Sequence, residues 1–326
     1  MSAGASGRLA RLAVCRAFAA ARAEARVAET EHGVSLVAAR DLPRNSRVVS
    51  TPFVSWAMRS AAFALANGPS EFLAAFGERT TRETVALAMS LLNERRNGES
   101  DAYARTLPDS FHFTDVCLNE TRVDALFRGT ETAARMKSRG AFIRSLADAT
   151  RLPVEDVSWA IGAVSSHAMK NDVVPYALVP GCDLLDHSSA ANCDVRRDAG
   201  SSPEIYCATT RDVVAGEKLT ISYGSSLNND RAFRMYGFAS PELYANDSRG
   251  VDIDGFATRF RGVHPSAPND AFERSVRELE NHRQKALDAW TADAETFSRR
   301  VVDDACAETL RRGQAEIIDA YVSALR

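Results

Sequence analysis

The pattern of apolar and polar residues changes character twice along the chain. Residues 34–40 (VSLVAAR) and 47–51 (RVVST) are short and rich in β-branched side chains, with a turn between them, so they predict two strands. Between about residues 57 and 160, apolar side chains recur every three or four positions, which is typical of helices. Because strand-like segments return after this insert, we expect a sheet that forms only when distant segments meet.

The clearest helical pattern covers residues 80–98. Thr80 and Glu83 have the spacing of a capping box, and Gly98 stands where the pattern ends. One face of this helix carries the apolar residues Val85, Met89 and Leu92. We interpret this stripe as part of the core, because a row of apolar side chains at helical spacing is typical of a buried face.

Three segments beyond the insert predict further strands. Residues 177–185 form a short apolar run, as expected of a buried strand. Residues 204–211 (EIYCATTR) and 217–224 (EKLTISYG) flank Ala215 and Gly216, which favours a hairpin. Helical patterns follow over residues 269–326.

The last of these strands ends in a tyrosine and a glycine. Strand alternation puts Leu219, Ile221 and Tyr223 on one face, and the two aliphatic residues predict that this face is buried. Tyr223 is then expected to point inward, where its hydroxyl needs a hydrogen-bond partner. Gly224 allows the chain to turn sharply after it. On this pattern alone, a core tyrosine at a strand end is the more common interpretation.

The composition excludes several classes of protein. The chain has 326 residues, of which 45% are hydrophobic and 25% charged, with a net charge of −3. No basic field indicates a nucleic-acid partner, and no apolar run is long enough to cross a bilayer. Six cysteines without a CxxC or CxC spacing indicate reduced thiols in an intracellular protein and no zinc site.

Residues 1–25 allow two interpretations. They are rich in alanine and arginine, and Glu24 is their first acidic residue, which would suit a mitochondrial presequence. The alternative is a helix that packs on the folded domain through the apolar side chains of Leu9, Leu12, Val14 and Phe18. We favour the helix, because alanine is the strongest helix former. We therefore expect a cytoplasmic protein, with a nuclear location as an alternative and a mitochondrial one if residues 1–25 are a presequence.

The segment from Cys182 to Val195 (CDLLDHSSAANCDV) holds the densest group of chemically active side chains. Its acidic residues, histidine, serines and cysteines allow a metal site, a catalytic dyad or a buried turn whose backbone is the functional part.

This segment and residues 210–224 (TRDVVAGEKLTISYG) resemble the SET-domain protein methyltransferases. In that family an NHS…NC segment passes beneath the strand before a YG pair and forms a pseudoknot around S-adenosylmethionine. Here the matching residues are Asp186-His187-Ser188 and Asn192-Cys193, and Tyr223-Gly224 match the YG pair. The resemblance favours the third interpretation, a turn that holds the cofactor's adenine through its backbone, with buried thiols at Cys182 and Cys193.

Six further segments are similar to one branch of that family, the Rubisco large-subunit lysine methyltransferase type. They are EHGVSLVAARDL, LAMSLLNERRNGESDAYARTLP, DVSWAIGAVSSHAM, ALVPGCDLLDHS, SLNNDRAFRMYGF and LRRGQAEIIDA. The branch also contains a methyltransferase that modifies a histidine of actin. The resemblance implies an α+β fold of short sheets with a pseudoknot, a helical insert and a helical C-terminal lobe. It also implies three parts: residues 1–25, a SET domain over residues 26–240 with its insert at about 57–158, and a short substrate-docking lobe over residues 241–326.

The same resemblance implies an activity and a set of site residues. The expected activity is S-adenosylmethionine-dependent methylation of a lysine, or a histidine, in a non-histone protein, by a monomer without metal, nucleic acid or membrane partners. The expected catalytic residue is Tyr223. The expected cofactor-binding residues are His32, Gly33, Val34, His167, Asp186, His187, Tyr236 and Phe238, and the expected substrate-binding residues are Asp183 and Tyr236.

Two positions depart from the family pattern. Asp186 replaces an asparagine, and a carboxylate can only accept hydrogen bonds, so it would receive the cofactor's ammonium but repel its carboxylate. His167 replaces an arginine that holds that carboxylate, and a neutral imidazole is a poor substitute. We therefore expect cofactor binding that tightens as the pH falls, which calorimetry at about pH 6 and about pH 8 tests. The alternative to an enzyme is a SET-fold binding module that has lost turnover.

Overall fold

The protein is described by a computed structural model over residues 22–30, 33–76, 78–98, 102–127, 131–201, 203–246, 248–253, 256–261 and Thr309. The chain forms two compact units, each of which uses two separate parts of the sequence. The first unit consists of Met1–Phe111 and Thr150–Ser225, and the second of His112–Ala149 and Ser226–Arg326. The predicted helical insert is thus divided between the two units.

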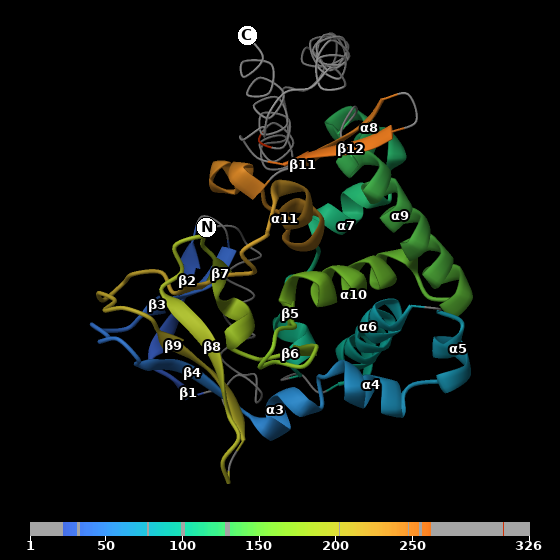
Figure 1. Ribbon diagram of the computed structural model, residues 1–326. Helices are drawn as coiled ribbons and strands as arrows, with labels where there is room; N and C mark the ends of the chain where they lie inside the picture. Colours follow the sequence, from blue (N-terminus) through green and yellow to red (C-terminus); the bar gives the residue numbers. More distant parts are fainter. Residues whose placement is uncertain are drawn as a thin grey trace, which may run out of the picture. The chain divides into compact units, whose positions relative to one another are not determined.

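The first unit contains the main sheet. Its four strands are antiparallel in the order β1 (Arg22–Ala23), β4 (Arg47–Pro52), β9 (Glu204–Thr209) and β8 (Cys193–Asp198) (Figure 1). A second pair joins β2 (Ala25–Thr30) to β3 (Gly33–Ala38). Strands β3 and β4 confirm the two strands predicted at residues 34–40 and 47–51, and they lie in different sheets.

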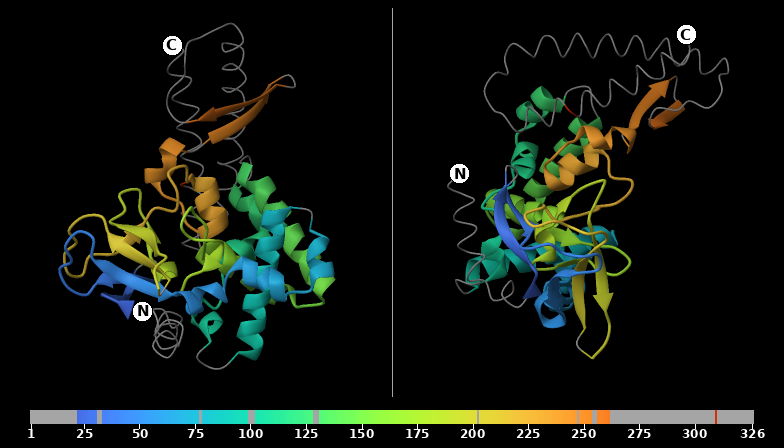
Figure 2. Two further views of the ribbon diagram at one scale, coloured as in Figure 1. Left: turned by 60° about the horizontal axis from the view of Figure 1, so that its bottom comes forward. Right: turned by 90° about the vertical axis from the view of Figure 1, so that its left-hand side faces the viewer.

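The hairpin predicted around Ala215 and Gly216 is wrong. Strand β9 pairs with β8 instead. The hairpin that β8 and β9 form is drawn in yellow in Figure 2. The chain after Gly216 pairs with β3, because Ala38 N donates to the Glu217 carbonyl at 2.9 Å and Leu219 N donates to the Leu36 carbonyl at 2.9 Å. Backbone partners on a distant strand therefore take the place of the local hairpin.

The strand predicted at residues 177–185 is also largely wrong. Only β6 (Ala177–Leu178) is extended, and it pairs with β5 (Ala168–Met169). Pro180 offers no N–H to a ladder, and Gly181 has a φ of 90°, which ends the strand. The chain then forms a short 3-10 helix, η2 (Cys182–Leu184).

The first unit also contains several helices. They are α3 (Phe53–Ala57), α4 (Ala61–Asn67), α5 (Ser70–Ala74), α6 (Arg79–Asn97), η1 (Tyr103–Thr106) and α10 (Val154–His167). Helix α6 packs against α4 and α10 (Figure 1). Its end at Gly98 is confirmed.

The capping box predicted at the start of α6 is wrong. The helix begins at Arg79, so Thr80 lies inside its first turn. The buried carboxylate of Glu83 instead binds Arg79 at 2.9 Å and Lys170 at 3.1 Å. Of the predicted stripe, Val85 and Leu92 are buried and Met89 is partly exposed.

The core of the first unit lies where β3, β4, β9 and η2 meet. Its members with no more than 1% of their surface exposed include Leu36, Ala38, Val48, Val49, Cys182, Leu185, Cys207 and Leu219. Ile221 is also buried, and the partly buried Tyr223 packs against this cluster. The predicted inward face of the last strand is therefore confirmed.

Over its described residues, the second unit is helical with one hairpin. Its elements are α7 (His112–Cys117), α8 (Glu120–Phe127), α9 (Glu131–Thr150), α11 (Asn229–Tyr236), η3 (Pro241–Asn246), β11 (Ser248–Ile253) and β12 (Phe256–Arg261). The mostly buried carboxylate of Asp230 connects two helices, because it binds Arg135 and Thr132 on α9 and Arg234 on α11. Burial works to raise the pKa of Asp230, but the hydrogen bonds and charges of the two arginines outweigh it and leave this pKa lowered.

Some predictions fall outside the described residues. These are the helical pattern over residues 269–326, apart from the single position Thr309, and most of the N-terminal helix predicted over residues 1–25. Of that helix only residues 22–25 are described, and there the prediction is wrong, because Arg22 and Ala23 form β1 and Ala25 begins β2. Within the described part of the chain, every helix is too short or too polar to cross a bilayer.

Candidate functional site

The candidate site lies in the first unit, where two segments far apart in the sequence run side by side. Strand β7 (Asp186–His187) pairs in parallel with β10 (Thr220–Ile221), in the register Thr220 to Asp186 and Ile221 to His187. Ser188 N continues the pairing by donating to the Ile221 carbonyl at 3.1 Å. The predicted meeting of the DHS segment with the strand before Tyr223 is thus observed.

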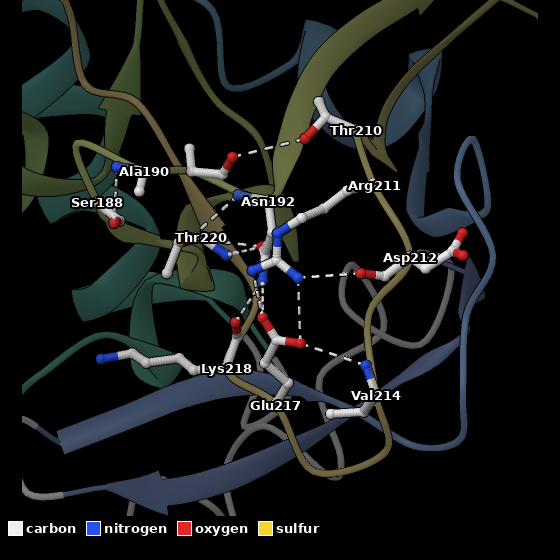
Figure 3. A network of polar contacts seen from close by, with 11 residues as sticks. Ser188, Ala190, Asn192, Thr210, Arg211, Asp212, Val214, Glu217, Lys218 and Thr220 are labelled. Atoms are coloured by element: carbon white, nitrogen blue, oxygen red, sulfur yellow. Dashed lines mark hydrogen bonds and ion pairs between the residues drawn. The ribbon is translucent and has the colours of Figure 1, made fainter.

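The buried amide of Asn192 connects these two segments (Figure 3). Its oxygen accepts from Thr220 N at 2.8 Å, and its nitrogen donates to the Lys218 carbonyl at 2.9 Å and to Glu217 at 3.1 Å. An asparagine suits this position, since its amide donates and accepts at once. Hydrogen bonds from Arg211 lower the pKa of Glu217, which therefore stays a charged acceptor.

Both the backbone and the hydroxyl of Tyr223 are hydrogen-bonded to the segment that contains β7. Its backbone N–H donates to Nδ1 of His187 at 3.1 Å, and its hydroxyl donates to the Leu185 carbonyl at 2.8 Å. The rings of His187 and Tyr223 lie 5.4 Å apart. Gly224, with a φ of 126°, turns the chain away directly afterwards. The hydroxyl position is therefore set by the backbone just before β7.

Asp186, the first departure from the family pattern, is paired with a cation. Its Oδ2 lies 2.7 Å from Nζ of Lys218 and accepts a hydrogen bond from the Ser35 hydroxyl at 2.5 Å. Ser35 belongs to β3, directly after Gly33 and Val34. The structure thus places three of the predicted cofactor-binding positions close together.

Asp183 lies in a buried polar cluster with His167, the second departure. Its Oδ2 accepts from the Tyr103 hydroxyl at 2.6 Å and lies 3.3 Å from Nδ1 of His167, while its Oδ1 accepts from Gly181 N at 2.8 Å. Only 3% of the Asp183 side chain and 10% of the His167 side chain are exposed. Burial, together with the charge of Asp183, raises the pKa of Tyr103 well above its usual value, so the phenol remains a donor.

Two of the predicted cofactor-binding residues, Tyr236 and Phe238, belong to the second unit. Tyr236 ends helix α11, and its ring lies 6.2 Å from that of Phe238. Between them, Gly237 adopts the left-handed conformation, with a φ of 80°. Burial raises the pKa of Tyr236.

The cysteines of the motif are buried thiols, as predicted. Cys182 and Cys193 are both fully enclosed, and Cys207 Sγ lies 3.4 Å from Cys182 Sγ. Burial raises the pKa of Cys193 to about 12, and the hydrogen bond to Cys182 together with burial raises that of Cys207. In the described part of the chain, no group of three or more histidine, cysteine and acidic residues could hold a metal ion.

Four residues at this site were not predicted from the sequence: Ser35, Tyr103, Leu185 and Lys218. Lys218 carried a sequence signal, because a lysine in the strand expected to pass beside Asp186 could balance its carboxylate. The structure places Lys218 two positions before Thr220, the observed strand partner of Asp186, and on the same side of the strand. The contacts of Tyr103 and Leu185 depend on the tertiary fold and left no local signal. His32 lies outside the described residues.

Comparisons with known proteins agree with this geometry. The family model described as "SET domain" matches residues 33–224. The solved SET domain of LSMT bound to lysine and AdoHcy is similar over 98% of this chain and 90% of its own, with a TM-score of 0.67 and 14% identity. Rubisco LSMT bound to AdoMet is similar over 99% and 92%, with a TM-score of 0.67 and 15% identity. Among curated protein sequences, none matches.

Proposed function

Since the chain belongs to the SET-domain family, we propose that it is a protein N-methyltransferase that uses S-adenosylmethionine. The first candidate for the methylated group is a lysine side chain of a non-histone protein, and the second is a histidine. The structural neighbours support the cofactor, because they were solved with AdoMet or AdoHcy, and one of them with lysine. The observation that carries the proposal is the hydrogen bond that fixes the Tyr223 hydroxyl beside β7.

The side chains around β7 fit this cofactor in their chemistry. Its amino-acid end carries an ammonium and a carboxylate, and the site presents the carboxylate of Asp186 beside the ammonium of Lys218. Backbone groups of Gly33, Val34 and His187 are the remaining candidates to hold it. When bound, S-adenosylmethionine supplies a methyl group on a positively charged sulfur, which an amine lone pair can take by in-line displacement.

The chain's own contribution is alignment and removal of water. A lysine amine is protonated at neutral pH and needs to lose its proton before it can attack. Apolar surroundings favour the neutral amine, and Tyr223 packs against the apolar core. Because the phenol proton of Tyr223 is directed to the Leu185 carbonyl, its oxygen acts as an acceptor that can orient the N–H groups of the amine.

A transfer assay tests the proposal. The full-length protein is incubated with radiolabelled S-adenosylmethionine and a cell lysate, beside the Tyr223→Phe variant and a Tyr206→Phe control. Tyr206 lies on β9, and its ring faces the guanidinium of Arg47. A labelled band that Tyr223→Phe loses and Tyr206→Phe keeps supports the enzyme.

One observation favours a second candidate function, a binding module without turnover. The imidazole of His167 lies against the buried carboxylate of Asp183, so it is poorly placed to replace the arginine of the family pattern. The same assay separates the two functions. Absence of any labelled band, with S-adenosylmethionine bound in calorimetry, identifies the binding module.

A further inference from the structure

The ion pair of Asp186 and Lys218 is built from separate segments. Asp186 lies on β7, and Lys218 precedes β10. The backbone of Lys218 forms a bridge with Val37 of β3, and its carbonyl accepts from Asn192. The strand partner of Asp186 is Thr220, two positions further along, so the Lys218 side chain leaves the strand on the same side as that of Thr220. The pair is therefore fixed by backbone pairing on both sides.

The two oxygens of the Asp186 carboxylate have different surroundings. Among the described residues, Ser35 donates a hydrogen bond to it and Lys218 forms an ion pair with it, and both do so at Oδ2. Oδ1 therefore remains for a further donor. The side chains of Asp186 and Lys218 are 36% and 33% exposed, so both can be reached by a small molecule.

This pairing changes the electrostatics of the site. A lone carboxylate would attract an ammonium group and repel a carboxylate at similar distances. A cation 2.7 Å from Asp186 offsets much of that repulsion, because the pair then acts on a nearby ligand as a dipole and not as a net negative charge. The pair together is close to neutral, as an asparagine amide would be, and still presents an acceptor at Oδ1.

We propose that Lys218 is a positioning residue of the cofactor site, which neutralises Asp186 so that the site accepts the zwitterionic amino-acid end of S-adenosylmethionine. The inference rests on the proposed function for the identity of the ligand. In this proposal, the positive charge of Lys218 compensates for the negative charge that Asp186 introduces in place of the family's neutral asparagine.

Titration calorimetry on the full chain tests this assignment with two ligands. S-adenosylhomocysteine carries the amino-acid end, whereas 5′-methylthioadenosine has the same nucleoside and a thioether but lacks that end. We expect Lys218→Met to weaken S-adenosylhomocysteine binding about tenfold, and to leave 5′-methylthioadenosine binding unchanged, because only the first ligand brings a carboxylate near Asp186. Lys218→Arg keeps the charge and should keep the affinity.

Two further variants show whether Lys218 acts through Asp186. In an Asp186→Asn background there is no charge to neutralise, so Lys218→Met should then change S-adenosylhomocysteine affinity less than about twofold. Lys137→Met is the matched control, since Lys137 pairs with Asp124 at 2.6 Å with similar exposure in the second unit, and its affinity should equal that of the wild type. Far-ultraviolet circular dichroism verifies that each variant is folded.

Equal S-adenosylhomocysteine affinity for the wild type and Lys218→Met would overturn the inference. So would an equal loss with and without the Asp186→Asn substitution, because Lys218 would then act independently of the carboxylate. Failure of the wild type to bind either nucleoside is a different result, which would overturn the proposed function itself.

Discussion

The hydroxyl of Tyr223 donates to the backbone carbonyl of Leu185 at 2.8 Å. Leu185 directly precedes β7, and the backbone of Tyr223 is bound to His187 within that strand. The tyrosine is thus held from both ends by the segment that pairs with its own strand. A hydroxyl fixed in this way needs no reorganisation when a reacting group arrives, which is the condition for efficient electrostatic catalysis.

The first prediction concerns that hydroxyl. Tyr223→Phe keeps the ring in the core but removes the acceptor, so we expect methyl transfer to fall by about 10²–10³-fold. The affinity for S-adenosylhomocysteine should stay within about twofold, since the phenol oxygen contacts the protein backbone. Single-turnover transfer and calorimetry measure the two quantities, and a variant that transfers at the wild-type rate would show that Tyr223 is structural.

The second prediction concerns the threading of the two segments. Asn192→Ala leaves the Thr220 N–H and the Lys218 carbonyl without their buried partner. We expect the free energy of unfolding to fall by about 2–4 kcal/mol, because each unsatisfied buried group costs about 1–3 kcal/mol. Urea unfolding followed by tryptophan fluorescence measures it.

Arg211→Ala is the control for this change. It removes the exposed ion pair to Glu217 in the same network but leaves no buried group unsatisfied. Its effect should be much smaller than that of Asn192→Ala. If the two substitutions destabilise the protein equally, the buried amide does not hold the segments together.

Local sequence patterns predicted the elements of this fold better than their partners. Residues 217–224 alternate as a strand should, and Leu219 and Ile221 are buried as expected. The alternation cannot specify that this stretch pairs with β3 and β7, because the choice depends on backbone contacts with segments more than thirty residues away. The predicted strand at residues 177–185 failed for a local reason, the left-handed Gly181 after Pro180.

The candidate site shows the same contrast between what local sequence predicts and what depends on tertiary contacts. The family resemblance pointed to Asp186, His187 and Tyr223, and the structure brings these three together. Their roles in binding and catalysis stay predictions. Lys218, which pairs with Asp186, and Tyr103, which donates to Asp183, lie inside the matching segments, but these contacts follow only from the tertiary fold.

The third prediction concerns pH and Asp230. Its pKa is lowered in the folded protein, so its ion pairs contribute fully to stability above the pKa it has when unfolded, near 3.8. That contribution is lost as the pH falls toward the lower folded value. We expect Asp230→Asn to be less stable than the wild type by about 3 kcal/mol at neutral pH, because it leaves Arg135 and Arg234 without their mostly buried, charged partner.

The difference between the two proteins should shrink below about pH 4, because the Asp230 carboxylate then takes up a proton in the unfolded wild type while it still stays charged in the folded protein. Urea unfolding at a series of pH values measures it. A difference that stays constant down to about pH 3 would mean that the Asp230→Asn substitution disturbs packing and that the charge is unimportant.

The last prediction compares two left-handed glycines. Gly237 has a φ of 80° at the end of α11, and a Cβ built there would lie 2.7 Å from Cε1 of His112 and 2.9 Å from Cδ1 of Phe113. Gly216 has a φ of 82° in the turn before β10, and a Cβ there would meet no atom within 4 Å. Alanine therefore meets backbone strain at both positions, about 1–2 kcal/mol, but steric overlap only at Gly237.

We expect Gly237→Ala to lower the free energy of unfolding by about 1–3 kcal/mol more than Gly216→Ala does. The overlap should displace either helix α7, which carries His112 and Phe113, or the turn between Tyr236 and Phe238. Thermal unfolding of the two variants measures the stability difference. Equal losses would mean that the ring of His112 moves aside at no cost, and that the tight contact between α7 and the end of α11 does not fix the position of Tyr236.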